Sequence, residues 1–276
     1  MKKERVDILL VQQGLFTSRE QAKRAVMAGQ VVGKNDERLD KPGEKIDPAI
    51  SLRVKGQVNP YVSRGGFKLA KAQDVFAIDF AGATVLDIGA STGGFTDVAL
   101  QNGARLVYAL DVGYNQLAWK LREDPQVVVM ERQNFRFSQP TDFTQGQPTI
   151  AVTDVSFISL ELILPPLTKI LAPGGHLAAL IKPQFEAGRD HVGKHGIVRD
   201  PAVHRTVLTK ILDFAQTQGY QVMGLDFSPI TGGSGNIEFL AYFKLIGQET
   251  PLVPYDPQTV DQVVANAWSV LTSKKI

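Results

Sequence analysis

Four charged residues stand where predicted strands or helices begin or end. Lys182 follows six mostly apolar residues in "HLAALIKPQF", Asp154 ends the strand in "VTDVSF", and Glu238 opens the last strand in "GNIEFL". Lys68 lies on the helix that leads into the sheet. Lys182 by itself could simply extend its ammonium group into solvent. Brought to one rim, however, two lysines and two carboxylates could orient a hydroxyl group, and a lysine that is neutral could take its proton.

A glycine-rich turn indicates where a ligand could approach the backbone. "VLDIGASTGGFTD" places Asp87 at a strand end, and Gly89, Gly93 and Gly94 follow before a helix begins. This spacing matches neither the dinucleotide fingerprint nor a phosphate-binding loop. Asp111 ends the next strand, where a carboxylate can accept hydrogen bonds from both hydroxyls of a ribose. The order of acid, glycine turn, helix, strand and acid resembles that of S-adenosylmethionine-dependent methyltransferases.

The same residues could be only turn glycines and helix-capping acids, although the second acid at the next strand end favours a ligand site. We therefore expect the cofactor S-adenosyl-L-methionine here, with an amide after the third strand as an adenine contact. The predicted cofactor-binding residues are Asp87, Gly89, Ser91, Gly93, Gly94, Phe95, Asp111 and Asn134.

Helix and strand patterns alternate from residue 61 onward. The predicted strands are 83–90, 106–112, 126–132, 149–157, 176–185, 220–230 and 237–245. The predicted helices are 65–76, 93–103, 115–124, 203–219 and 256–276. Such alternation predicts a mostly parallel sheet covered on both faces. The last two strands are joined by a tight loop, so the last one should run antiparallel and begin beside the carboxyl ends of its neighbours.

The first sixty residues differ from the rest in charge and pattern. They hold 12 Lys and Arg residues against 8 Asp and Glu residues, whereas the remaining 216 residues hold 18 against 20. Two short amphipathic helices are predicted within 5–29, the second capped by Ser18, and short strands follow. Arg19, Lys23 and Arg24 share the exposed side of that second helix. This basic stripe could be a solvated face or could bind a polyanion.

Composition excludes several other classes. The chain has no cysteine, so neither disulfides nor a zinc–thiolate site can form. No secretory signal and no run of about eighteen uncharged apolar residues is found, so we expect a cytoplasmic protein without a membrane partner. His191 and His195 lack a third ligand, and we expect no metal. Arg189 and Lys194, in the same glycine-rich segment, are expected instead to contact RNA from a mobile rim loop.

Both parts of the chain resemble known families. Residues 1–58, including "GLFTSREQAKRAVMAGQV", resemble the small α+β alpha-L RNA-binding domain. Residues 59–62 would be a linker, and residues 63–276 resemble the FtsJ-type methyltransferase domain, a Rossmann-like class I α/β fold. Five motifs make the whole chain similar to the TlyA family, in which many members carry the label hemolysin: "SRGGFKL", "DIGASTGGFTD", "DVSFISL", "KPQFEAGR" and "GNIEFLAYF".

The resemblance implies an activity and the residues that carry it. TlyA proteins methylate the ribose 2′-hydroxyl of cytidine in ribosomal RNA, so the partner would be ribosomal RNA or a ribosomal subunit. Lys68, Asp154, Lys182 and Glu238 match the catalytic tetrad, although sequence leaves open which member takes the proton. The expected RNA-binding residues are Arg5, Ser18, Arg19, Lys23, Arg24, Arg64, Arg189 and Lys194. Two alternatives are a non-catalytic RNA-binding or ribosome-assembly factor and a pore-forming hemolysin.

Overall fold

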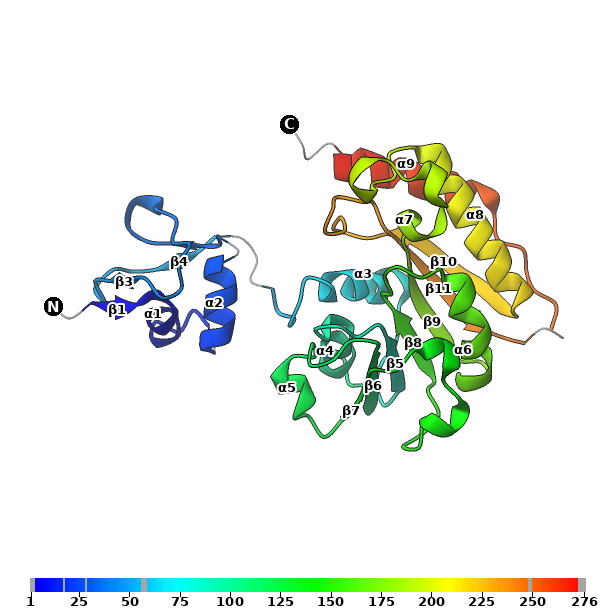
Figure 1. The fold of residues 1–276 in the computed structure, drawn as a ribbon, viewed down its shortest axis with the longest axis horizontal. Coiled ribbons are helices and arrows are strands. Elements are labelled where there is room, and N and C mark those ends of the chain that lie inside the picture. The colour runs from blue at the N-terminus through cyan, green and yellow to red at the C-terminus, as the bar shows by residue number, and fades with distance from the viewer. Residues whose placement is uncertain (1–2, 17, 28, 56–58, 248–249, 273–276) are drawn as a thin grey trace. The chain divides into compact units, whose positions relative to one another are not determined.

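The computed structural model describes residues 3–16, 18–27, 29–55, 59–247 and 250–272. The chain divides into two compact units, Met1–Pro60 and Tyr61–Ile276 (Figure 1). The expected end of the first domain at residue 58 lies outside the described residues. Each unit has its own hydrophobic core, so each is considered by itself.

The N-terminal unit is a small α+β structure. Its helices are α1 (Val6–Gln12) and α2 (Arg19–Met27), and its short strands are β1 (Glu4–Arg5), β2 (Val31–Val32), β3 (Lys45–Ile46) and β4 (Arg53–Val54). β1 pairs with β3 and β2 pairs with β4, both antiparallel. Leu9 and Leu10 pack against Ala22 and Val26, which confirms the two predicted amphipathic helices. The Ser18 hydroxyl accepts a hydrogen bond from the Gln21 backbone at 3.3 Å, as a helix cap should.

A buried carboxylate holds two of the basic residues of this unit. Asp7 is fully buried, and it accepts hydrogen bonds from Arg5 at 2.9 and 3.0 Å and from Arg19 at 3.1 Å. The hydrogen bond from Arg5 outweighs burial and, with that from Arg19, lowers the pKa of Asp7 to about 2. Lys23 lies 3.7 Å from Glu20. The basic stripe is therefore partly neutralised within the unit, which its sequence alone does not indicate.

The second unit is built around a seven-stranded sheet. Its strands are β5 (Thr84–Ile88), β6 (Leu106–Asp111), β7 (Val127–Glu131), β8 (Ile150–Thr153), β9 (His176–Ile181), β10 (Tyr220–Phe227) and β11 (Phe239–Leu245). Their order in the sheet is β10-β11-β9-β8-β5-β6-β7. Among these strands β11 runs opposite to the other six: it pairs antiparallel with β10 and with β9, and the remaining pairs are parallel. The predicted mostly parallel sheet with an antiparallel last strand is confirmed.

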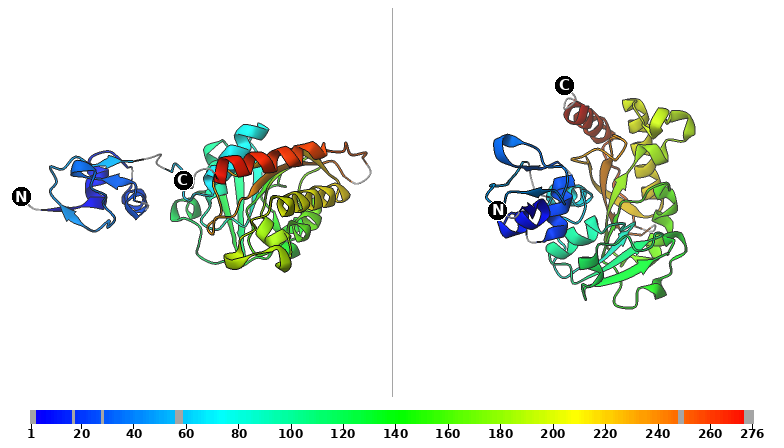
Figure 2. Two further views of the ribbon diagram at one scale, coloured as in Figure 1. Left: turned by 90° about the horizontal axis from the view of Figure 1, so that it is seen from above. Right: turned by 60° about the vertical axis from the view of Figure 1, so that its left-hand side comes forward.

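Helices cover both faces of this sheet (Figure 1, Figure 2). Val85 of β5 packs in a core with α3 (Gly66–Phe76) and α4 (Gly94–Gln101). Leu86 and Ile88 of the same strand face the opposite core. That second core includes residues from α6 (Leu164–Ile170), α8 (Pro201–Thr217) and α9 (Pro257–Thr272). Because both faces are buried, the strands read as nearly continuous apolar runs.

Several predicted segments have different bounds in the structure; the strands expected over 149–157 and 220–230 end at Thr153 and Phe227, so Asp154 follows its strand. The helix expected at 115–124 is only α5 (Trp119–Arg122), since Asn115 has a left-handed φ of 58° and donates its N–H to Glu131 instead. The strand expected over 176–185 ends at Ile181, and α7 (Pro183–Glu186) follows because proline has no N–H for a strand ladder and suits a first helical turn. Glu238 precedes β11 rather than opening it. Residues 273–276 of the predicted closing helix lie outside the described residues.

We predict that Asp7→Asn lowers the free energy of unfolding of the N-terminal unit by about 1–3 kcal/mol, because two guanidinium groups lose a charged acceptor. Hydrogen exchange of α1 and α2 amides in the full-length protein measures this. Asp40→Asn, which removes only an exposed pair with Arg38, should change little. Because the pKa of Asp7 is lowered, its stabilisation is complete above about pH 4 and lost as the pH falls toward 2. Unchanged protection in Asp7→Asn would contradict this role.

Candidate active site

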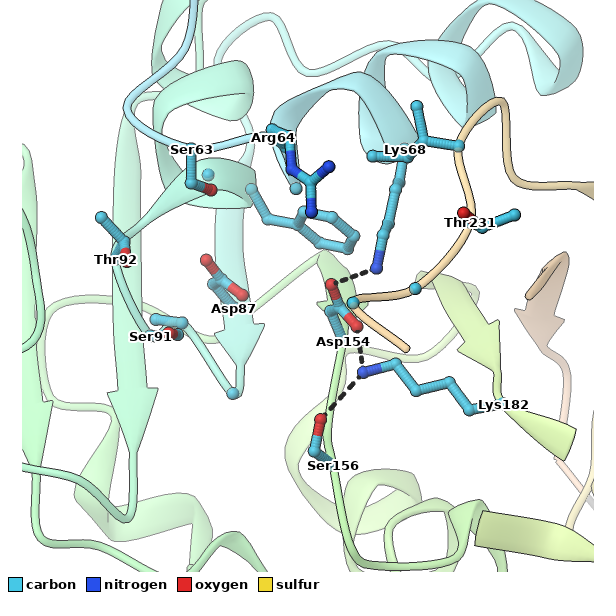
Figure 3. Close-up of a pocket in the computed structure, with 18 residues that line it drawn as sticks. Ser63, Arg64, Lys68, Asp87, Ser91, Thr92, Asp154, Ser156, Lys182 and Thr231 are labelled. Atoms are coloured by element: carbon cyan, nitrogen blue, oxygen red, sulfur yellow. Dashed lines mark hydrogen bonds and ion pairs between the residues drawn. The ribbon is translucent and has the colours of Figure 1, made fainter. Parts of the chain in front are cut away.

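Lys68, Asp154, Lys182 and Glu238 meet at the carboxyl end of the central strands, and Figure 3 shows both lysines directed at Asp154. Lys68 Nζ lies 2.7 Å from Glu238 Oε2 and 3.1 Å from Asp154 Oδ2. Lys182 Nζ lies 2.6 Å from Asp154 Oδ1. Asp154 therefore bridges the two ammonium groups. The parallel order of β8 and β9 and the reversed direction of β11 bring these chain positions together.

The four charges compensate one another in a largely buried place. Lys68, Lys182 and Glu238 are 8%, 7% and 2% exposed. Burial would lower the pKa of Lys68, but the carboxylates of Asp154 and Glu238 outweigh it and raise that pKa. Burial would raise the pKa of Asp154, but Lys182 and Lys68 outweigh it and lower that pKa. Lys68 is thus held as a cation and Asp154 as an anion, while Lys182 contacts a single carboxylate.

Two further polar residues complete this cluster, and sequence analysis did not single them out. The Lys182 ammonium donates a hydrogen bond to the Ser156 hydroxyl at 3.0 Å. The Gln184 amide donates to Glu238 Oε1 at 3.4 Å. Ser156 lies two residues after Asp154 in the segment predicted as strand 149–157, so the period of two could have placed both side chains on one side, although β8 ends at Thr153. Gln184 gave no such signal, because the segment after Lys182 was expected to be strand.

In the turn between β5 and α4, some of the glycines are needed because neighbouring protein atoms leave no room for a side chain. Gly89 and Gly93 have φ values of 87° and 95°, which favour glycine. A Cβ on Gly93 would lie 2.3 Å from Leu121, and a Cβ on Gly94 would lie 2.3 Å from the Ser63 hydroxyl. Gly94 lines a cavity that Lys68 and Asp154 also line, whereas Gly93 lines neither this cavity nor the one that adjoins it. The sequence predicts that each of these glycines lets a ligand approach the backbone, but at Gly93 the space beside the backbone is filled by Leu121.

Asp87 presents an unusual carboxylate to a cavity of about 350 Å³, which Lys68, Asp154 and Lys182 also line. Its Oδ2 accepts from the Thr96 backbone N–H at 2.9 Å and the Thr96 hydroxyl at 2.7 Å. Its Oδ1 is buried and has no hydrogen-bond partner among the described residues. Burial outweighs the Thr96 hydrogen bonds and raises the pKa of Asp87 to about 7. Such an oxygen suits a ligand that brings a hydrogen-bond donor or a positive charge.

A second cavity of about 700 Å³ adjoins the first, since Gly89, Ser91, Asp154 and Ser156 line both. Asp111 and Asn134 line this second cavity, as do the apolar side chains of Leu110, Phe135 and Ile163. Asp111 Oδ2 accepts from the Ser91 backbone at 2.8 Å, and Oδ1 accepts from the Gly113 backbone at 2.7 Å. Phe95 lines the first cavity. Apart from Gly93, the predicted cofactor residues therefore surround one continuous cleft.

The expected RNA-binding residues are less closely grouped. Arg64 is exposed and lines the first cavity (Figure 3). Arg189 and Lys194 are exposed and line neither cavity of the cleft. The remaining five, Arg5, Ser18, Arg19, Lys23 and Arg24, belong to the N-terminal unit. The described residues contain no group of three His, Cys, Asp or Glu side chains able to hold a metal ion.

We predict that Asp87→Asn raises the stability of the ligand-free protein at alkaline pH. A carboxyl whose folded pKa is raised favours folding when protonated, so the wild-type protein loses this contribution as the pH rises from about 4 to 7. Asparagine keeps an oxygen for Thr96 and cannot ionise. The difference in unfolding free energy between Asp87→Asn and the wild-type protein should favour the variant by roughly 1–4 kcal/mol more at about pH 8 than at about pH 5. Urea unfolding measures this, with exposed Asp190→Asn as the control; parallel pH curves would exclude the assignment.

The chain matches the FtsJ-like methyltransferase family over residues 61–245. It is 57% identical to YqxC of Bacillus subtilis, provisionally named an rRNA methyltransferase, over 99% of this chain and 97% of that protein. It is 41% identical to TlyA of Mycobacterium tuberculosis, named a 16S/23S rRNA (cytidine-2′-O)-methyltransferase, over 88% of this chain and 90% of that protein. A solved structure from Streptococcus thermophilus, provisionally described as a hemolysin, is 56% identical, has a TM-score of 0.79, and is matched over 100% of this chain and 99% of that chain. The chain therefore belongs to the FtsJ-like methyltransferases and, among them, to the TlyA family.

Proposed function

We propose that this protein transfers a methyl group from S-adenosyl-L-methionine to the ribose 2′-hydroxyl of a cytidine in ribosomal RNA. The observation that carries the proposal is the bridged cluster of Lys68, Asp154, Lys182 and Glu238 on the rim of the cleft. The names of the relatives from Bacillus subtilis and Mycobacterium tuberculosis support ribosomal RNA as the substrate. The cytoplasm, where ribosomes are made, is then the expected place of action.

The cleft has groups that fit each part of the cofactor. Asp111 offers carboxylate oxygens for ribose hydroxyls, and Asn134 and Phe135 offer an amide and an apolar surface for adenine. The unpartnered Oδ1 of Asp87 fits a cationic amino group. Ionised Asp87 would favour that group, so binding should lower the pKa that burial raises. When bound, the cofactor supplies an electrophilic methyl group on a sulfonium.

Lys182 is the best candidate to take the proton of the ribose hydroxyl. Lys68 contacts two carboxylates, which raise its pKa and keep it a cation. Lys182, by contrast, contacts one carboxylate and a neutral hydroxyl. Lys182 would first release its own proton to solvent, because only the neutral amine has a lone pair for the ribose hydroxyl. Lys68, Asp154 and Glu238 would orient that amine and the hydroxyl, and Lys182 would take the hydroxyl proton as the methyl group is transferred to the ribose oxygen.

The N-terminal unit is proposed to hold the RNA backbone. Arg5 and Arg19 each use part of a guanidinium on Asp7, and both keep exposed surface, at 37% and 53% of the side chain. A guanidinium has five N–H donors, so one held at Asp7 can still contact a phosphate. Lys23 and Arg24 add charge on the same helix. Phosphate contacts of this kind position RNA without reading its sequence.

Other activities make different predictions about the same site. A non-catalytic assembly factor would have no need for two buried ammonium groups joined by a carboxylate, because burying charged groups costs free energy. A relative from Brachyspira hyodysenteriae is named Hemolysin A. Within the described parts of the chain, no helix is both long and apolar enough to cross a bilayer. Leakage from lipid vesicles is the direct assay for that activity.

The proposed function predicts new 2′-O-methylcytidine in ribosomal RNA treated with protein and cofactor, mapped against untreated RNA. Lys182→Arg should lower the single-turnover rate by about 10²-fold or more, because a guanidinium stays protonated. It should leave cofactor affinity, measured by calorimetry, nearly unchanged. Lys244→Arg, on β11 and outside the cavities of the cleft, is the matched control. Absence of any ribose methylation would refute the function, and a near wild-type rate for Lys182→Arg would remove the proton-transfer role.

A further inference from the structure

A third cavity, of about 410 Å³, lies beside the first cavity, which is the catalytic one. None of the tetrad residues or predicted cofactor-binding residues lines this third cavity. Arg64, Ile230 and Thr231 line both cavities, so these side chains form the wall between them. Ile237 and the end of α9, Leu271 and Thr272, line the far side. We call this space the flanking cavity.

The walls of the flanking cavity suit a flat, partly polar ring. Ile230, Ile237 and Leu271 give it an apolar surface. The Thr231 hydroxyl can donate or accept a hydrogen bond, and the Thr272 hydroxyl, which donates to the Trp268 carbonyl, can still accept one. Its volume is in the range of small-molecule sites, and the combination of apolar walls with a few polar groups is typical of them. A nucleobase has this character, with apolar faces and a polar edge.

Arg64 stands at the junction of the two cavities with its charge unused. It is exposed, and its guanidinium makes no hydrogen bond or ion pair with any residue that the structure describes. In Figure 3 its side chain extends into the catalytic cavity on the same side as Lys68. A planar guanidinium binds a phosphate with two parallel hydrogen bonds. A phosphate held there would have one nucleoside on the catalytic side and its neighbour on the other.

We propose that the flanking cavity binds the base of the nucleotide adjacent to the one that is methylated, with Arg64 on the phosphate that joins them. The inference rests on the proposed methylation of RNA. A ribose hydroxyl reaches the buried lysines only if its nucleotide is drawn out of the surrounding stack, and the adjacent base then loses a stacking partner. An apolar cavity one phosphate away would replace that lost contact.

Site-specific crosslinking tests the position of the base. Thr272 is exposed at the cavity rim and would be replaced by p-benzoylphenylalanine, in the full-length protein with S-adenosylhomocysteine and ribosomal RNA. Irradiation should attach it to the nucleotide immediately before or after the methylated one, mapped on the same RNA. The same replacement at Val270, which does not line the cavity, should not mark that nucleotide. If the crosslink falls only on distant nucleotides while the wild-type protein methylates the RNA normally, the base-binding role of the flanking cavity is wrong and the proposed function still stands.

A filled cavity gives a second test that does not depend on crosslinking. Leu271→Trp should raise the KM for RNA about fivefold or more and leave kcat and cofactor affinity close to wild type, whereas exposed Val270→Trp should change neither. An RNA with an abasic residue at the adjacent position should be bound equally weakly by wild-type and Leu271→Trp protein. If Leu271→Trp binds cofactor and its KM for RNA is unchanged, the proposal is wrong. If the wild-type protein methylates no RNA, the proposed function and this inference both fall.

Discussion

The site depends on one carboxylate, Asp154, that contacts two buried ammonium groups at once. Its two oxygens lie 3.1 Å from Lys68 and 2.6 Å from Lys182. Without that bridge, two positive charges in a largely buried rim would repel each other and lose hydration. Glu238 supplies the second negative charge, so the four groups are neutral together while Lys182 keeps the weaker set of partners. That balance holds while both lysines are protonated, so Lys182 must release its own proton before it can take one from a hydroxyl.

The order and direction of the strands bring the residues of this bridge together. Parallel β8 and β9 deliver Asp154 and Lys182 from adjacent strand ends, and antiparallel β11 delivers Glu238 from its beginning. The loop before β11 is itself secured, because the buried Asn236 side chain accepts from the Val198 backbone at 3.0 Å and donates to the Gly196 carbonyl at 2.8 Å. The segment that carries Lys194 is thereby tied to the loop that ends at Glu238.

Much of this could be predicted from the sequence because the relevant signals are local. Alternating helices and apolar runs indicate a parallel sheet, and a charged residue directly after an apolar run indicates a strand end, so the meeting of Lys182 and Asp154 followed from topology. The partners of those residues could not be predicted, because contacts such as that of Gln184 with Glu238 depend on where a chain turns after a strand. The packing that requires glycine at position 93 could not be predicted either, since the neighbouring Leu121 is distant in sequence. Arg5 and Arg19 read as free positive charge because the burial of Asp7 is a property of the folded unit.

The central claim is that Asp154 and Lys182 act as one unit, and a double-mutant cycle tests it most directly. Single-turnover methyl transfer to ribosomal RNA at saturating cofactor would be compared for wild type, Asp154→Asn, Lys182→Met and the double variant. If the bridge makes one catalytic unit, the double variant is about as slow as the slower single variant, because removing either member already disables the pair. If the two losses multiply, Asp154 and Lys182 work independently, and the bridging carboxylate is not what the site depends on.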